Sequence, residues 1–128
     1  MDNFEFTVET KKDFISTVDS VVRETEKAGF RVLYVHDVQE TLSKKGFTIE
    51  PLKIIEICNA KNAYDVLQKD LRMGLLLPCK INVYQKEGVT YISGMKPSVM
   101  KSIFKGMDLE ELFKKVEEVV DIIINKAK

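Results

Sequence analysis

The chain has 128 residues, of which 45% are apolar and 31% are charged, and its 20 basic residues balance 20 acidic ones. The length predicts one domain over residues 1–128, and the composition excludes a disordered chain. Zero net charge argues against nucleic acid and anionic membranes as partners, because proteins bind both through basic surfaces. The two cysteines are too few for a disulfide scaffold.

The N-terminal residues Met1–Glu5 contain no basic segment and no apolar segment, so they do not predict a secretory signal. Strongly apolar runs such as residues 75–77 are far shorter than the roughly 20 residues that cross a membrane. We therefore expect a cytoplasmic protein whose thiols are reduced.

Strands and helices alternate along most of the chain. Apolar residues at every second position indicate strands, and a spacing of three or four residues indicates helices. In chain order, the predicted elements are a strand at 4–9, a helix at 11–28, a strand at 31–36, a short helix at 38–45, a strand at 52–58, a helix at 60–70, a hairpin of strands at 79–85 and 89–93, a short helix at 97–104 and a helix at 108–127. Without the short helix at 97–104, the order β-α-β-α-β-α-β-β-α predicts an α+β fold, with a mixed, mainly antiparallel five-stranded sheet and helices packed largely on one face.

Polar residues at the predicted helix starts are N-cap signals. These signals are Thr10 with Asp13, Asp37 with Glu40, Asn59, and Asp108 with Glu111. In the last helix, Ile122 and Ile124 lie off the apolar stripe, and this extra apolar surface, or alternatively the opposite face of the sheet, is a candidate contact with a second subunit.

Cys58 is the most informative residue for function. It ends a predicted strand directly before Asn59, where the positive end of the helix dipole and unpaired N–H groups favour a reactive thiolate. Strand alternation places Glu56 on the same side as Cys58, and Ile55 and Ile57 on the other side. The alternative is that Cys58 is a small core residue and that Glu56 lies on a solvated sheet face.

Cys79 and His36 are weaker signals. Cys79 follows Pro78 at the start of a strand, where a core position is the simpler interpretation, although pairing of the third and fourth strands would bring it near Cys58. His36, the only histidine, is a candidate base or ligand near the thiols, or else a structural residue.

The sequence contains no glycine-rich phosphate loop, no nucleophile elbow and no Cys-x-x-Cys motif. Met95, Met100 and Met107 would suit Cu(I) together with thiolates, but their spacing has no metal signature and predicts core filling. We therefore predict no metal centre, and the sequence names no cofactor.

Four segments stand out together. They are Glu56-Ile57-Cys58-Asn59-Ala60, Ala63-Tyr64, Leu76-Leu77-Pro78-Cys79 with the strand that follows it, and Glu87-Gly88. They closely resemble the signature of the family called domain of unknown function 302, and the similarity extends from the first strand to Pro97. Ala60 stands where the family often has proline, and either residue can begin a helix.

The resemblance implies a compact α+β domain that associates as a homodimer, and it implies no established reaction. The family's motif residues fall on Glu56, Cys58, Asn59, Pro78 and Cys79. Most of these positions are also the ones that the residue types single out.

Three functions fit these observations. The first is a dimeric small-ligand or sulfur-binding module with a thiol-lined site at Glu56, Cys58 and Cys79, and with Asn59 and His36 as further binding residues. The second is a non-catalytic structural or interaction dimer whose cysteines only pack. The third is a thiol-dependent enzyme with Cys58 as nucleophile and Glu56 or His36 as base. Two thiolates and a carboxylate would hold Zn²⁺ or Cu(I) only if they converge.

Overall fold

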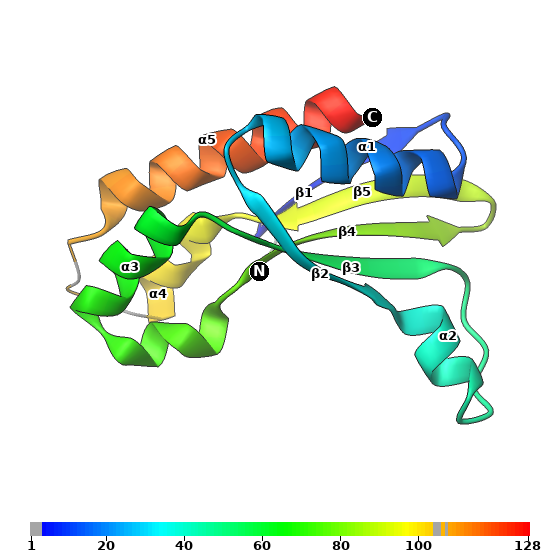
Figure 1. Ribbon diagram of the computed structural model, residues 1–128, viewed down its shortest axis with the longest axis horizontal. Coiled ribbons are helices and arrows are strands. Elements are labelled where there is room, and N and C mark those ends of the chain that lie inside the picture. Colours follow the sequence, from blue (N-terminus) through cyan, green and yellow to red (C-terminus); the bar gives the residue numbers. More distant parts are fainter. Residues whose placement is uncertain (1–3, 104–105, 107) are drawn as a thin grey trace.

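The computed structural model describes residues 4–103, 106 and 108–128. One sheet is formed by β1 (Glu5–Thr10), β2 (Arg31–Asp37), β3 (Leu52–Cys58), β4 (Cys79–Lys86) and β5 (Val89–Met95). The helices are α1 (Phe14–Lys27), α2 (Val38–Ser43), α3 (Ala60–Lys69), α4 (Met100–Ile103) and α5 (Glu110–Ala127), with 3₁₀ helices η1 (Leu71–Leu76) and η2 (Pro97–Val99). Figure 1 shows their arrangement.

The sheet has the strand order β1-β5-β4-β3-β2, and its four pairings are all antiparallel. The predicted α+β class and the mainly antiparallel five-stranded sheet are therefore confirmed, whereas the prediction of a mixed sheet is wrong, because no pair in the described part of the sheet is parallel. The β4–β5 hairpin closes at Glu87 and Gly88, whose φ angles are 53° and 81°. Positive φ at both residues is what a two-residue hairpin turn with the twist of the strands requires.

Helices α1 and α5 lie side by side on one face of the sheet (Figure 1). Alternate strand residues beneath them, including Ile55, Ile57, Ile81 and Val83, are fully buried and form the main core. The opposite face, called the open face below, is not covered by α1 or α5, and it carries Tyr84 stacked on Tyr91. The predicted packing of helices on one side is confirmed.

A second apolar cluster lies where β3 ends and β4 begins. Helices α3, α4, α5 and η1 meet there, at one end of the sheet (Figure 1). Its buried residues are Val66, Met73, Met100, Leu109 and Phe113. The main core and this second cluster therefore meet at a seam beside the ends of β3 and β4.

Two helix starts differ from the prediction. Thr10 is the last residue of β1, and α1 is capped by Asp13 alone, whose carboxylate accepts a hydrogen bond from the Ser16 N–H at 2.8 Å. Helix α5 begins after Leu109 and not after Asp108, and it has no side-chain cap. Leu109 is buried in the second cluster, so packing fixes this start. The other two predicted caps are confirmed; they are Asp37 and Asn59.

Close packing of α5 on β5 corrects one further expectation. Ile124 is fully buried in the main core, so the prediction that it adds apolar surface is wrong, whereas Ile122 is 49% exposed. A Cβ atom at Gly94 of β5 would lie 2.9 Å from Cδ1 of Ile124 and 3.0 Å from Cγ1 of Val120. The absent side chain at Gly94 thus lets α5 approach the sheet and bury Ile124. No helix in the described ranges is both long enough and apolar enough to cross a membrane.

We predict that Gly94→Ala lowers the free energy of unfolding by about 1–3 kcal/mol, because the added methyl group forces α5 away from β5. Gly74→Ala is the matched control, since a Cβ atom there meets only Cδ2 of Leu67 at 3.8 Å, an ordinary contact. Urea unfolding followed by circular dichroism measures both variants. Equal stabilities would contradict the close approach.

Candidate functional site

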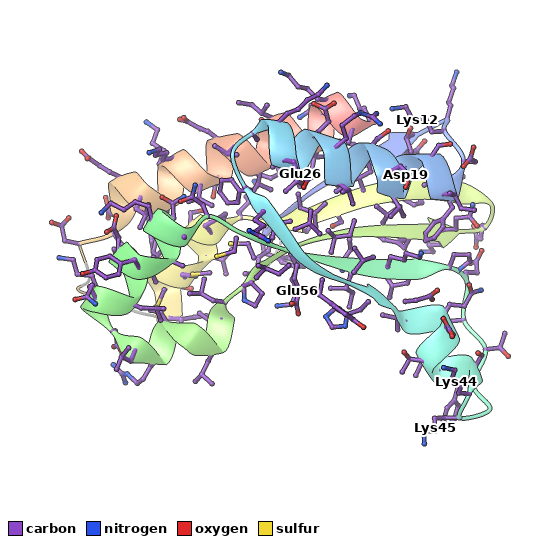
Figure 2. The ribbon with its side chains drawn as sticks, viewed as in Figure 1. Lys12, Asp19, Glu26, Lys44, Lys45 and Glu56 are labelled. Atoms are coloured by element: carbon purple, nitrogen blue, oxygen red, sulfur yellow. The ribbon has the colours of Figure 1, made fainter. Side chains whose placement is uncertain are left out.

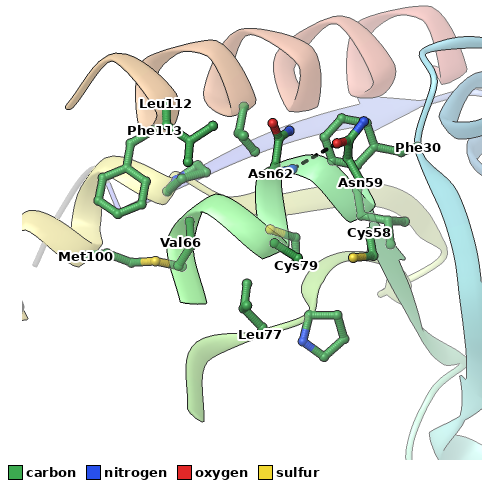
Figure 3. A pocket seen from close by; sticks show the side chains of 15 residues that line it. Phe30, Cys58, Asn59, Asn62, Val66, Leu77, Cys79, Met100, Leu112 and Phe113 are labelled. Carbon is green, nitrogen blue, oxygen red and sulfur yellow. Dashed lines mark hydrogen bonds between the residues drawn. The ribbon is translucent and has the colours of Figure 1, made fainter. Parts of the chain in front are cut away.

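The seam between the two apolar clusters contains a small cavity with a volume of about 40 Å³ (Figure 3). This volume exceeds the roughly 10–15 Å³ that one water molecule needs, and it is far below the roughly 300 Å³ of an ordinary small-molecule site. The apolar side chains of its wall include Phe30, Ile57 and Val116 of the main core and Val66, Met100 and Phe113 of the second cluster. A ligand that enters without rearrangement must therefore be very small.

Both cysteines line this cavity (Figure 3). Ile57 and Cys79 are cross-strand partners, so Cys58, the last residue of β3, lies beside Cys79, the first residue of β4. Both thiols are free. The thioether of Met100 also belongs to the wall, so side chains carrying three sulfur atoms surround one small apolar space.

Burial favours the protonated form of both thiols. It raises the pKa of Cys58, which is opposite to the direction predicted from the helix start, so the predicted thiolate is wrong. Burial also raises the pKa of Cys79; the neighbouring Cys58 raises it further, while Lys80 lowers it. The electrostatic effect of Cys58 on Cys79 follows from the adjacent positions of the two residues at the ends of β3 and β4.

Asn59 uses its side-chain amide for structure. Its Oδ1 accepts a hydrogen bond from the Asn62 N–H at 3.0 Å, which caps α3. Its Nδ2 donates to the carbonyl oxygen of Gly29 at 3.3 Å, which ties the start of α3 to the turn between α1 and β2. Asn59 therefore helps to fix Cys58 in the cavity wall, and its role in ligand binding stays a prediction.

The structure separates Glu56 and His36 from this cavity. Nε2 of His36 and Oε2 of Glu56 are 2.8 Å apart, and the ring of Tyr34 meets the His36 ring edge-on with centroids 4.5 Å apart. These side chains lie on the open face, and Figure 2 shows Glu56 on the side of the sheet away from α1. Neither Glu56 nor His36 lines the cavity. The binding roles predicted for them stay predictions, but they would belong to a separate place.

The strand pattern does not reveal the helical side of the cavity. Val66, Met100, Leu112 and Phe113 close it from α3, α4 and α5, and only their helical spacing as core residues marks them in the sequence. The prediction of core filling is confirmed for Met100, which is buried, and is wrong for Met95, which is exposed. Met107 lies outside the described residues.

Metal ligands do not gather in the described part of the chain. No group of three or more His, Cys, Asp or Glu side chains there could hold a metal ion. The cavity wall that contains the two thiols contains no carboxylate and no imidazole among its described residues.

Comparison with known proteins agrees with the fold and with the family resemblance. The model of the family Domain of unknown function DUF302 matches residues 6–127. The chain belongs to this family. A crystal structure described as an uncharacterized conserved protein DUF302 from Bacillus stearothermophilus is similar, with a TM-score of 0.92, 30% sequence identity, and coverage of 98% of this chain and 99% of that chain. No curated protein matches the chain. The resemblance noted from the motifs is confirmed, and neither description states a biochemical function.

We predict that both cysteines react more slowly with iodoacetamide at neutral pH than in the unfolded chain, because a raised pKa leaves less thiolate. As the pH rises and Cys58 ionises, Cys79 should become the slower of the two, since burial and then the Cys58 thiolate both raise its pKa. Mass spectrometry of alkylated peptides from about pH 6 to about pH 10 gives both rates, with the urea-unfolded chain as reference.

The raised pKa values of the two thiols also make the stability of the fold depend on pH. A thiol whose pKa is higher in the folded state stabilises that state fully below the unfolded pKa, and this stability is lost as the pH rises through the folded pKa. A Cys58 that reacts faster in the folded chain than in the unfolded chain would contradict the burial that we describe.

Proposed function

We propose that this protein is a small-ligand-binding domain whose site is the cavity lined by Cys58 and Cys79. The observation that carries the proposal is the convergence of two cysteines, far apart in the sequence, on one apolar cavity. A void is unfavourable in a packed core, because the atoms that line the void lose contacts. A cavity that two thiols line is therefore a candidate for occupation by a ligand.

The wall indicates the chemistry of that ligand. Protonated thiols and the thioether of Met100 are soft, weakly polar groups, and the rest of the wall is mainly apolar. Such a wall favours a ligand that is small and either apolar or sulfur-seeking, and it disfavours a charged, strongly hydrated one. The volume of about 40 Å³ limits the ligand, or the part of it that enters, to a few atoms.

The enzymatic alternative has less support. Nucleophilic catalysis by Cys58 needs a lowered thiol pKa or an adjacent base. Burial raises the pKa of Cys58, and the two candidate bases, Glu56 and His36, are hydrogen-bonded to each other on the open face. The packing alternative is favoured by one observation, which is that Cys79 packs against the main core.

We also propose that two copies associate as a homodimer, as the family resemblance implies. Ile122, exposed on α5, supports an apolar contact. Light scattering after gel filtration measures the mass in solution, and a monomer at every concentration would contradict the dimer. The cytoplasmic location stays a prediction.

A shared thiol site predicts that one Ag⁺ ion occupies both cysteines. Ag⁺ is a soft, redox-inert monovalent ion that displaces thiol protons and binds sulfur donors. After one equivalent of Ag⁺ is added to the reduced protein, we expect neither Cys58 nor Cys79 to react with iodoacetamide, as measured by mass spectrometry. Protection of about half of the thiols, with complete protection only at two equivalents, would contradict a shared site and would favour cysteines that only pack.

Variants assign the ligands. Cys58→Ser and Cys79→Ser each leave one thiol, and each should bind Ag⁺ at least about tenfold more weakly than the wild type. Met100→Leu should also weaken binding, whereas Met73→Leu is the matched control, because Met73 is buried in the second cluster but does not line the cavity. Equal Ag⁺ affinities of the two methionine variants would show that Met100 is not a ligand in this site.

A further inference from the structure

A second, larger cavity lies between η1 and the open face of the sheet, with a volume of about 310 Å³. This volume is at the lower end of the roughly 300–1,000 Å³ that small-molecule sites occupy. The cavity shares Pro78, Cys79, Pro97 and Met100 with the thiol-lined cavity, so the two are neighbours, but Cys58 does not line it. It can therefore hold a ligand of its own.

Exposed apolar side chains surround this second cavity. Phe4, Leu75 and Met95 line it, and their exposed fractions are 46%, 86% and 40%. They come from three separate places in the chain: the segment before β1, η1, and the last residue of β5. Apolar surface gathered around a hollow marks a binding site, because an apolar ligand would remove that surface from water.

Asn82 lines this cavity and carries a hydrogen-bond acceptor without a partner. It lies in β4, between its cross-strand partners Ile54 of β3 and Ser93 of β5. Its Oδ1 is buried and has no hydrogen-bond partner among the described residues. A buried polar atom without a partner destabilises a fold, so it needs an explanation. A ligand in the cavity whose N–H or O–H group reaches this oxygen would satisfy it.

The other polar side chains of the wall already have partners. The hydroxyls of Ser93 and Thr7 share a hydrogen bond at 2.9 Å, and the Thr7 hydroxyl also donates to the carboxylate of Glu5. Nζ of Lys80 donates to the carbonyl oxygen of Pro78 at 3.2 Å. Glu5 and Lys80 carry opposite charges, so the wall has no net charge that would select an ion. Among the described polar groups of the wall, Oδ1 of Asn82 is the one that is buried without a partner.

We propose that this second cavity binds a neutral, largely apolar small molecule that donates one N–H or O–H hydrogen bond to Oδ1 of Asn82. The apolar body of the molecule packs against Leu75, Met95 and Met100. The site goes beyond the thiol-lined cavity: Cys79 and Met100 line both cavities, but the second one is tested through Asn82 and Leu75, which do not line the first. Each of the two sites can therefore fail its own test without affecting the other.

Indole and 1-methylindole are the probes that test this site, because they share an apolar ring system and differ in the single N–H donor. Titration of the ¹⁵N-labelled full chain is followed by two-dimensional NMR. We expect the backbone amides of Asn82, Ser93 and Gly94 to shift on addition of either probe. Indole should bind about tenfold more tightly than 1-methylindole, since only indole satisfies the buried acceptor.

Asn82→Leu isolates the hydrogen bond. This variant should bind indole and 1-methylindole with about the same affinity, while Asn125→Leu, the same change on the exposed side of α5, should keep the wild-type ratio. Asn82→Leu should also unfold at the same or a higher urea concentration than the wild type, because it removes an unpaired buried polar atom.

A pair of leucines on η1 keeps the test decisive if Asn82→Leu does not fold. Leu75 and Leu71 are 86% and 80% exposed, but only Leu75 lines the cavity. Leu75→Asp should weaken the binding of both probes at least about tenfold, and Leu71→Asp should leave it unchanged. The proposal is overturned if the wild type binds both probes equally, if neither binds, if the shifts map elsewhere, or if the two leucine variants behave alike.

Discussion

Ile57 in β3 and Cys79 in β4 are cross-strand partners, and this register decides where the two thiols lie. It is fixed by burial, because Ile55, Ile57 and Ile81 are fully buried beneath α1 and α5. A shift by one residue would turn these isoleucines to the open face and would carry Cys79 out of the seam with them. The register that completes the main core thus also brings Cys79 beside the end of β3. Any change that weakens this core should disturb the candidate site as well.

Much of the fold could be predicted from local patterns. Alternation in the strands, the caps Asp37 and Asn59, and the turn at Glu87 and Gly88 all act through neighbouring residues, and the structure shows each of them. Helix η1 was not predicted, because a 3₁₀ helix is short and lacks the period of an α-helix. It forms where Met73 is fully buried in the second cluster, which is a tertiary contact that no local pattern reports.

The candidate sites were only partly predictable. Alternation groups Cys58 with Glu56, yet Cys58 lines the cavity and Glu56 does not. Cys58 ends β3 directly before the cap of α3, so the strand period no longer fixes the direction of its side chain. The position of Cys58 at a helix start suggested a thiolate, but burial decides the pKa in the other direction. Asn82 carried no signal in the sequence, because its unpaired oxygen depends on neighbours in two other strands.

The closeness of the two thiols is measured most directly by the pKa of Cys79 with and without its neighbour. Two ionisable groups that share a small apolar cavity titrate as a coupled pair. Burial raises the pKa of Cys79, and the ionised Cys58 raises it further; a serine hydroxyl in place of Cys58 does not ionise in this range. The pKa of Cys79 is obtained from the ¹³Cβ chemical shift of labelled cysteine as a function of pH. We predict that Cys58→Ser lowers the pKa of Cys79, and an unchanged value would show that the thiols do not share one cavity.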